Sequence, residues 1–255
     1  MSRPAISFII PAYNEESCLG RTLDAIHRSA TATAPEYEVI VVDDGSTDRT
    51  KDLAIANEAT VVPVVKRHIA AVRNAGAHTA TGDYLFFVDA DTEINSSLLQ
   101  ASVKTLSSGA VGGGCRFRFD RPIPWYGHFA ERIVAPLYSL AGLAGGFFLF
   151  CTRAAFESAG GFDESRFASE EVWLSLALRK RGRFIIVPEY VTTSGRKLRA
   201  YTFVETCCLI TRLAMRGPAS LRQRQGLDFW YGERRVDRQG IVRPSTDDDT
   251  NSPPP

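Results

Sequence analysis

Short apolar runs alternate with helical patterns through the first third of the chain, and this alternation restricts it to few folds. The runs are rich in β-branched and aromatic residues, as expected of strands that are buried on both faces of a sheet. They cover residues 6–10, 39–42, 60–65 and 84–88. The helical patterns between them cover residues 15–28, 48–57 and 70–81, and the expected cap of the second is Ser46 or Thr47. This order predicts an α/β fold with a doubly wound, mostly parallel central sheet.

Polar clusters follow three of these runs directly. Pro11-Ala12-Tyr13-Asn14-Glu15 follows the first run, Asp43-Asp44 the second and Asp89-Ala90-Asp91 the fourth. In open α/β sheets, ligands bind beyond the carboxyl ends of the strands. We therefore expect the three clusters to form one site at this rim of the sheet.

The second half of the chain alternates less regularly. The expected strands are residues 110–119, 147–151 and 184–187, and the expected helices are residues 125–140, 154–158, 171–181 and 201–215. No internal repeat or linker divides the chain, so we expect a single domain over residues 1–235. Residues 236–255 are expected to be a disordered tail, because the sequence after Arg243, PSTDDDTNSPPP, cannot form a core.

The charge balance and the cysteines exclude some classes of function. The net charge of +1 provides no global field that would attract nucleic acid, although residues 196–238 hold ten Lys or Arg against four Asp or Glu. The five cysteines form no CxxC pair, which indicates free thiols in a reducing compartment. The first residues show no secretory leader, so a cytoplasmic location is expected.

One stretch, residues 133–151, has no charged residue over nineteen positions, which approaches the length of a membrane span. Pro136, Gly142 and Gly145-Gly146 interrupt it, so we expect a short apolar helix followed by a buried strand. Peripheral docking on the inner face of a membrane is the alternative that stays open, because Arg-rich helical segments follow. The helix at 201–215 has three candidate roles: homodimer contact, membrane contact or core packing.

The Asp89-Ala90-Asp91 cluster is the candidate metal site. Two carboxylates one residue apart at a strand end can both face a hard divalent cation, and Mn²⁺ or Mg²⁺ prefers oxygen ligands and bridges well to diphosphate. Such an ion acts as a Lewis acid on a leaving nucleotide diphosphate. The alternative is a structural turn that leads into a helix at Ser96.

Asp44 and Arg73 are the candidate nucleoside contacts. Asp44 can accept a hydrogen bond from a nucleobase imide, or it can cap a strand-to-helix turn. Arg73 can meet a base or a phosphate at the N-terminus of its helix, where backbone N–H groups also favour anions, or it can begin a surface helix.

Three longer segments contain these clusters in a specific order: PAYNEE (11–16), VVDDGSTDRT (41–50) and RNAGAHTATGDYLFFVDADT (73–92). In that order they resemble glycosyltransferase family 2, whose members have the GT-A fold. The resemblance continues through GGFFLFCTRAAFESAGGFDES, SEEVWLSLALRKRG and FIIVPE and covers roughly Ile6 to Ser194. It implies an inverting enzyme that uses a nucleotide-sugar donor and depends on Mn²⁺ or Mg²⁺. Residues 1–95 would be its nucleotide-binding half and residues 96–235 its acceptor half.

The resemblance also implies roles for residues at the rim. Asp89 and Asp91 are expected to hold the metal and to flank the diphosphate. Gly145-Gly146 would let a sugar approach the backbone closely, since glycine has no Cβ. The full set of expected donor-binding residues is Pro11, Ala12, Tyr13, Glu15, Asp44, Arg73, Asp89, Ala90, Gly146 and Arg196.

Inversion by a single displacement needs a base that takes the proton of the acceptor hydroxyl. In relatives an acidic pair, usually Glu-Asp, opens the helix after the GGFDE stretch. Here the pair is Glu170-Glu171, which implies Glu171 as the base and Glu170 as its catalytic neighbour, with Glu where Asp is usual. The alternative is that both only favour the positive end of their helix. Asp163 is expected to contact sugar hydroxyls or to cap the turn at 161–162.

A second departure concerns the third metal ligand. Some relatives place a His in a C-terminal segment, but no His follows His128 in this chain. Arg196 or Lys197 lies where that segment would be and could neutralise the diphosphate instead; the alternative is a solvated basic turn. Trp230-Tyr231, near Arg234-Arg235, are expected to cover the acceptor cleft or a neighbouring subunit, or to pack in the core.

The expected reaction is metal-assisted sugar transfer, from a UDP-sugar by preference, to a hydroxyl acceptor that is either free or lipid-linked. Transfer to polyprenyl phosphate is the first alternative, and Glu170-Glu171 argue against it because an anionic acceptor needs no base. A nicotinamide or flavin dehydrogenase would need a Gly-rich turn after the first strand, and residues 11–15 contain no Gly. An inactive nucleotide-sugar-binding module is the third alternative. All of the expected carboxylates are present in the sequence, which argues against it.

Overall fold

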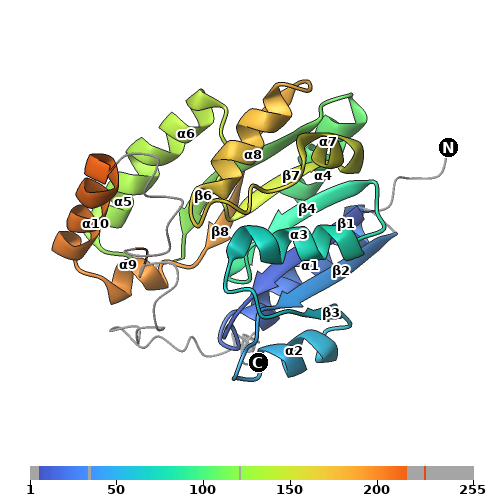
Figure 1. Cartoon of the computed structure of the whole chain (residues 1–255), viewed down its shortest axis with the longest axis horizontal. Coiled ribbons are helices and arrows are strands. Elements are labelled where there is room, and N and C mark those ends of the chain that lie inside the picture. The colour runs from blue at the N-terminus through green and yellow to red at the C-terminus, as the bar shows by residue number, and fades with distance from the viewer. Residues whose placement is uncertain (1–5, 34–35, 121, 217–226, 228–255) are drawn as a thin grey trace, which may run out of the picture.

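The computed structural model describes residues 6–33, 36–120, 122–216 and Leu227, and an eight-stranded sheet forms its centre (Figure 1). The strand order is β3-β2-β1-β4-β7-β6-β8-β5. The first four strands in sequence are parallel to one another. They are β1 (Ile6–Ala12), β2 (Tyr37–Asp43), β3 (Thr60–Pro63) and β4 (Tyr84–Val88). The predicted α/β fold with a mostly parallel central sheet is confirmed.

Helices cover both faces of these strands, which explains why the strand sequences are apolar without interruption. Side chains alternate across a strand, so Phe8 and Ile10 belong to the core on one face while Ile9 belongs to the core on the other. The first core includes residues of α1 (Leu19–Thr33), α2 (Thr50–Ala56) and α4 (Ser96–Ser107). The second includes residues of α3 (Ile69–Thr79), α7 (Arg153–Ala159) and α8 (Glu170–Arg179).

The second half of the chain adds one strand, β7, that runs opposite to the first four. β7 (Phe148–Thr152) is antiparallel to both of its neighbours, β4 and β6 (Gly112–Phe119). β8 (Phe184–Thr193) runs parallel to β6 and antiparallel to the short β5 (Thr92–Glu93). The pairing of β5 with β8 brings the segment that follows Asp91 next to the end of β8, about a hundred residues later in the chain.

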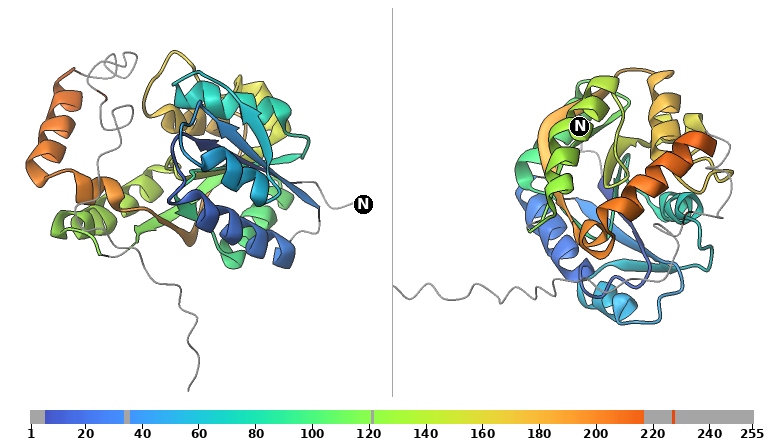
Figure 2. Two further views of the ribbon diagram at one scale, coloured as in Figure 1. Left: turned by 90° about the horizontal axis from the view of Figure 1, so that it is seen from below. Right: turned by 90° about the vertical axis from the view of Figure 1, so that its left-hand side faces the viewer.

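A group of helices lies at the end of the molecule opposite α2 (Figures 1 and 2). The predicted helix at 125–140 is present but is interrupted by a π-helical turn that ends just before Ala135-Pro136. Pro136 has no N–H to continue the ladder of helical hydrogen bonds. The helices of this group are α5 (Trp125–Phe129), the π turn (Ala130–Val134), α6 (Ala135–Ala141), α9 (Arg196–Ala200) and α10 (Phe203–Arg216).

The uncharged stretch 133–151 forms the end of this helical run and then strand β7, as expected. In the part of the chain that the structure describes, no helix combines the length and the apolar character that a bilayer crossing requires. The predictions for Trp230-Tyr231 and for the tail at 236–255 lie outside the described residues.

The prediction that Ser46 or Thr47 caps α2 is wrong. The helix begins at Thr50 after Arg49, whose side chain makes no capping bond. Ser46 Oγ instead accepts from the backbone N–H of Asn14 at 3.0 Å, and the N–H of Thr47 donates to Asn14 Oδ1 at 2.8 Å. Ser46 and Thr47 therefore join the loops after β1 and β2, and the N–H of Thr50 at the start of the helix donates to Asp48 Oδ1 at 3.0 Å.

β8 extends beyond the predicted Val187 to Thr193. The register explains the difference, since Val187 pairs with Cys115 and Tyr190 with Arg116, which leaves Pro188 and Glu189 in a bulge. Proline cannot donate to a ladder and is tolerated at bulges, so a strand interrupted by proline continues on the other side.

Gly76 determines how closely α3 packs on the sheet. A Cβ at this position would overlap Ile9 Cγ2 and lie 2.8 Å from Val42 Cγ2. We predict that Gly76→Ala lowers the free energy of unfolding by about 1–3 kcal/mol, the usual cost of overpacking, although alanine favours helix. Gly20→Ala in α1 is the matched control, because its Cβ would meet nothing within 4 Å. Urea denaturation compares the two, and equal losses would contradict this packing.

Candidate active site

The turn between β4 and β5 places Asp89 and Asp91 at the carboxyl-end rim, as predicted. The N–H of Thr92 donates to the carbonyl of Asp89 at 3.1 Å, and Thr22 Oγ1 from α1 donates to the carbonyl of Ala90 at 2.9 Å. Ala90 is buried, whereas the Asp89 and Asp91 side chains are 34% and 15% exposed. The backbone of the turn is therefore fixed on α1, and its carboxylates remain at the edge of the site.

Arg73 connects this turn to the acidic pair. Its Nη2 lies 2.7 Å from Asp89 Oδ1 and 2.7 Å from the carbonyl oxygen of Gly146, and its Nη1 lies 2.6 Å from Glu170 Oε1. The side chain is 3% exposed and lies inside α3 rather than at its start. The alternative of a surface helix start is wrong, because the helix packs this arginine against the carboxylates of two other elements, and its position in the second turn also differs from the expected helix N-terminus.

Arg73 keeps its charge in this environment. Burial alone would lower its pKa, but Asp89, Glu170 and Glu171 together raise the pKa above its ordinary value. A permanent positive charge at this point stabilises the carboxylates that it contacts.

Glu170 and Glu171 form the first turn of α8. Glu170 is 5% exposed in its side chain and is paired with Arg73, so it does more than favour a helix end. Burial, and then the charge of Glu170, raises the pKa of Glu171 to about 8, against an ordinary value of 4.5. A Cβ on Gly146 would lie 3.6 Å from Glu171 Cδ and 3.4 Å from Arg73 Nη2, which are ordinary contact distances, so Gly146 lies beside both side chains.

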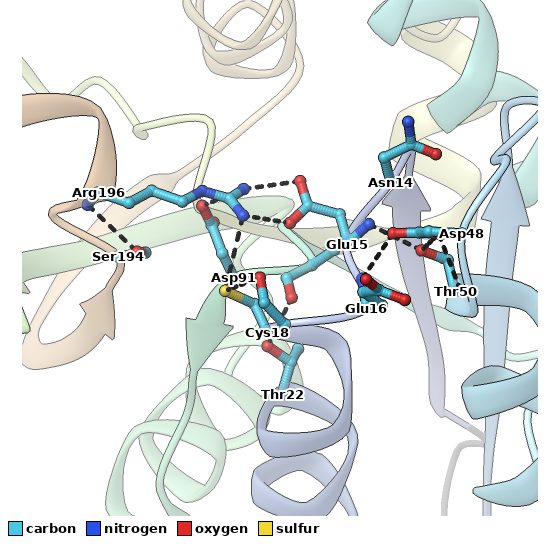
Figure 3. Close-up of polar contacts among 12 residues, drawn as sticks. Asn14, Glu15, Glu16, Cys18, Thr22, Asp48, Thr50, Asp91, Ser194 and Arg196 are labelled. Carbon is cyan, nitrogen blue, oxygen red and sulfur yellow. Dashed lines mark hydrogen bonds and ion pairs between the residues drawn. The ribbon is translucent and has the colours of Figure 1, made fainter. Parts of the chain in front are cut away.

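Arg196 makes a second contact between charged groups of the rim (Figure 3). Its Nη1 lies 2.6 Å from Glu15 Oε2, and its Nη2 lies 2.7 Å from Glu15 Oε1 and 3.0 Å from Asp91 Oδ2. The solvated-turn alternative for Arg196 is wrong, because the side chain is 19% exposed and bound to two acids. The Glu15 carboxylate, expected to line the nucleoside pocket, is bound to this arginine.

Of the expected nucleoside residues, Pro11, Ala12, Tyr13 and Asp44 lie at the ends of β1 and β2, whereas Arg73 is bound to Asp89 and Glu170 instead. Pro11 and Ala12 are buried, and the N–H of Asp44 donates to the carbonyl of Ala12 at 2.9 Å. Asp44 Oδ1 accepts from the backbone N–H groups of Lys66 and Arg67 at 2.6 and 3.0 Å. Asp44 thus organises the loop after β3 and does not cap α2.

Arg67 is a neighbour of Tyr13 and Asp44 that the sequence did not indicate. Its guanidinium carbon lies 3.5 Å from the centre of the Tyr13 ring, a cation–π contact. The backbone of Arg67 has a φ of 49°, a left-handed conformation that the two hydrogen bonds of this loop to Asp44 support. Tyr13 and Arg67 therefore face each other beside Asp44.

Asn74 is the other residue without a predicted role. Its Nδ2 donates to the carbonyl of Phe162, and the N–H of Phe162 donates to its Oδ1, both at 2.9 Å. These bonds attach the loop before α8 to α3 beside Arg73. Asp163 binds within its own loop, to the N–H of Ser165 at 3.0 Å and to Arg166 at 2.8 Å, and these bonds go to residues after it and not to the turn at 161–162 that it was expected to cap.

The carboxylates of the turn have the right chemistry for a hard divalent ion. Within the described residues, no three Asp, Glu, His or Cys side chains are grouped closely enough to hold a metal on their own. Mg²⁺ and similar ions are commonly bound by one or two carboxylates together with substrate phosphates and water. Asp89 and Asp91 therefore fit a metal that binds with a diphosphate and not one held by a protein cage.

The chain matches the family model described as Glycosyl transferase family 2 over residues 7–158. Glycosyltransferase AglE from Haloferax volcanii is 34% identical over 138 residues, which are 51% of this chain and 44% of that protein. Undecaprenyl-phosphate 4-deoxy-4-formamido-L-arabinose transferase from Photorhabdus laumondii is 31% identical over 147 residues, 53% of this chain and 44% of that protein. The chain spans less than half the length of these curated relatives.

Solved structures share the fold. The mannosyltransferase PcManGT from Pyrobaculum calidifontis, in complex with GDP-Man and Mn²⁺, aligns with a TM-score of 0.66 at 22% identity, over 83% of this chain and 61% of that one. Glucosyl-3-phosphoglycerate synthase from Mycobacterium tuberculosis, in complex with Mn²⁺, UDP and glucosyl-3-phosphoglycerate, aligns with a TM-score of 0.61 at 20% identity, over 83% and 77%. These likenesses establish the GT-A fold that the sequence predicted.

We predict that Arg73→Met lowers the free energy of unfolding by about 3–5 kcal/mol, because it leaves the buried carboxylate of Glu170 without its partner. Adding Glu170→Gln to this variant should recover part of the loss. Arg21→Met is the control, since the Arg21–Glu93 pair is largely exposed at 3.8 Å and should cost less than about 1 kcal/mol. Chemical denaturation measures all three, and similar losses for Arg73→Met and Arg21→Met would contradict the buried pairing.

The raised pKa of Glu171 predicts a pH-dependent stability. Between the ordinary value of 4.5 and about 8, the folded protein keeps this proton while the unfolded chain loses it. The stabilisation is therefore complete at low pH and is lost as the pH rises toward the folded pKa. Glu171→Gln does not titrate, so its melting temperature should increase relative to wild type as the pH is raised across this interval. Glu157→Gln, with a 65% exposed carboxylate, should show no such trend, and a constant difference for Glu171→Gln would contradict the shift.

Proposed function

The chain belongs to glycosyl transferase family 2, and we propose that it is an enzyme that transfers a sugar, with inversion, from a nucleotide diphosphate donor to an acceptor hydroxyl. One observation carries this proposal. Arg73 joins Asp89 of the β4–β5 turn to Glu170 of the acidic pair, so the donor side and the acceptor side meet at a single buried cation.

The donor side is built from the residues after β1, β2 and β4. We propose that Tyr13 and Asp44 bind the nucleoside with the backbone of Pro11 and Ala12, and that Arg196 faces the diphosphate. The loop that Asp44 holds through Lys66 and Arg67 supports this role, because it keeps the carboxylate beside the Tyr13 ring. A UDP-sugar is the favoured donor, and a GDP-sugar is the alternative that the PcManGT likeness adds.

Asp91 and Asp89 are the proposed ligands of Mn²⁺ or Mg²⁺, an ion that would supply Lewis-acid stabilisation of the leaving diphosphate when bound. Hard carboxylate oxygens at a strand end support this role. Arg73 binds Asp89 Oδ1, and Arg196 binds Asp91 Oδ2. The side chain of Asp89 thus has a set orientation before any ligand arrives.

On the acceptor side, Glu171 is the proposed base. Its carboxylate would take the proton of the acceptor hydroxyl as that oxygen attacks the anomeric carbon from the side opposite the leaving group. Glu170 and Arg73 are the paired charges beside Glu171, and Gly146 is proposed to let a sugar approach the backbone closely, since glycine has no Cβ. A base with a raised pKa matches a hydroxyl proton better than an ordinary carboxylate does, at the cost of being protonated below about pH 8.

Transfer to a polyprenyl phosphate is the second candidate. The undecaprenyl-phosphate transferase likeness favours it, and so do the exposed apolar side chains at the end formed by α5, α6 and α10. The exposed residues are Trp125, Phe129, Ile133, Leu137, Leu140, Phe203 and Val204. A cytoplasmic location at the inner face of a membrane, a homodimer and an inactive binding module stay predictions from the sequence.

The proposal predicts metal-dependent nucleotide binding. A nucleotide diphosphate present at 100 times its Kd should stabilise the protein by about 2.7 kcal/mol, which a thermal-shift assay detects. UDP and GDP should shift the melting temperature more with Mn²⁺ than without it, and Asp91→Asn should abolish the metal-dependent part. The absence of any metal-dependent shift with UDP, GDP, ADP and CDP would refute the proposal.

Glu171→Gln separates the two acceptor classes. We expect the variant to lose about 10²–10⁴-fold in kcat toward hydroxyl acceptors, the usual contribution of a general base, while its donor binding is retained. Activity kept on polyprenyl phosphate after the same change would favour the phosphate acceptor. Glu157→Gln on α7 serves as the control, and an undiminished rate on a hydroxyl acceptor in Glu171→Gln would remove Glu171 as the base.

A further inference from the structure

The guanidinium of Arg196 lies between two acids that come from different parts of the fold (Figure 3). Nη1 contacts one oxygen of Glu15, and Nη2 is shared between the other oxygen of Glu15 and Asp91 Oδ2. Its planar fork allows this arrangement, whereas the point charge of a lysine would favour one acid at a time. Arg196 is thus the cation of the Glu15–Asp91 acid pair.

The backbone around this contact is fixed. Thr193 pairs with Thr92 in the short β5–β8 ladder, and the N–H of Ser194 donates to the carbonyl of Asp91 at 3.1 Å. The backbones that carry Arg196 and Asp91 are therefore held side by side. A change in their contact has to come from the long arginine side chain.

The two arginines of the rim differ in how firmly they are held. Arg73 is 3% exposed and is also bound to the carbonyl of Gly146. Arg196 is 19% exposed, and beyond its two acids the contact that its guanidinium makes among the described residues is to Cys18 Sγ at 3.6 Å. The Arg196 side chain can therefore exchange one partner for another more easily than Arg73 can.

We propose that Arg196 is a positioning residue that makes metal binding depend on the donor. Without ligand, its guanidinium neutralises Asp91 and competes with a divalent ion for that carboxylate. A bound diphosphate offers the same guanidinium a bidentate anionic partner, which releases Asp91 for the ion. The inference rests on the proposed function, because it takes the donor to be a nucleotide diphosphate.

Thermodynamic linkage makes this proposal measurable. If the donor releases Asp91, the nucleotide tightens metal binding, and the metal tightens nucleotide binding by the same factor. Removing Arg196 should change the two single-ligand affinities in opposite directions. The metal alone should bind more tightly, because its competitor is gone, and the nucleotide alone should bind more weakly, because a cation is lost.

The experiment is a titration with MnCl₂, followed by electron paramagnetic resonance of free Mn²⁺, with and without saturating UDP or GDP. Calorimetry then measures the affinity of the nucleotide in the absence of metal, which completes the thermodynamic cycle of metal and nucleotide binding. In Arg196→Met, Mn²⁺ alone should bind at least about fivefold more tightly than in wild type, the lower end of typical coupling between sites. The factor by which the nucleotide tightens Mn²⁺ binding should shrink correspondingly.

Arg21→Met is the matched control. Arg21 also lies near Cys18 Sγ, at 3.9 Å, and near the rim, but its ion pair is with Glu93 and not with Asp91. It should change Mn²⁺ affinity by less than about twofold, since exposed pairs contribute little. Arg196→Lys keeps the positive charge but loses the planar guanidinium, so its Mn²⁺ affinity should lie between those of Arg196→Met and wild type. It replaces Arg196→Met in the comparison if that variant does not fold.

Unchanged or weaker Mn²⁺ binding in the Arg196 variants would overturn the inference while leaving the proposed function intact, provided that wild type binds nucleotide and Mn²⁺ together. If wild type binds no nucleotide diphosphate under any condition, the proposed function fails. The metal-only comparison still tests the competition between Arg196 and Mn²⁺ in that case, because it involves no nucleotide.

Discussion

The concentration of negative charge at one rim of the sheet is the constraint on which the rest of the site depends. Five carboxylates meet there: Glu15, Asp89, Asp91, Glu170 and Glu171. Like charges a few ångströms apart repel strongly in a partly dry site. Arg73 and Arg196 reduce this repulsion by pairing with four of the five. Among the described residues, Glu171 is the acid left without an arginine partner of its own, and its pKa is raised to about 8, which suits a base better than a ligand for a cation.

Two features of the backbone packing, both outside the group of charged side chains, bring these side chains together. Gly76 lets α3 pack closely on β1. This close packing places Arg73 of α3 within hydrogen-bond distance of Asp89 in the β4–β5 turn. The β5–β8 ladder joins Thr92 to Thr193, and this pairing carries Arg196 to Asp91. Neither the packing at Gly76 nor the β5–β8 ladder is a contact between the charged side chains of the site. A substitution that disturbs either one would therefore act on the site through the position of an arginine.

The sequence predicted the strands of the first half well, because uninterrupted apolar runs with polar ends have few other interpretations. The strand at 84–88 has the predicted bounds, and Asp44 and Asp89 lie at the rim as expected. The ion pairs of Arg73 and Arg196 could not be predicted, since each joins elements that are distant in the chain. For the same reason the cap expected at Ser46 or Thr47 is replaced by bonds to Asn14. Periodicity reports local structure, whereas long-range pairing depends on the assembled sheet.

The two arginines have different roles in this interpretation. Arg73 is a positive charge with fixed partners, and Arg196 is a positive charge that can change its partners. A cation that must organise Asp89 and Glu170 before substrate arrives benefits from full burial, because a buried pair in good geometry does not reorganise. Arg73 meets that description, with a third bond to the carbonyl of Gly146. A cation that must move from a carboxylate to a diphosphate should instead be partly exposed. Its side chain can then break one ion pair and form another. Arg196, which among the described residues is held by two carboxylates and a sulfur, meets that second description.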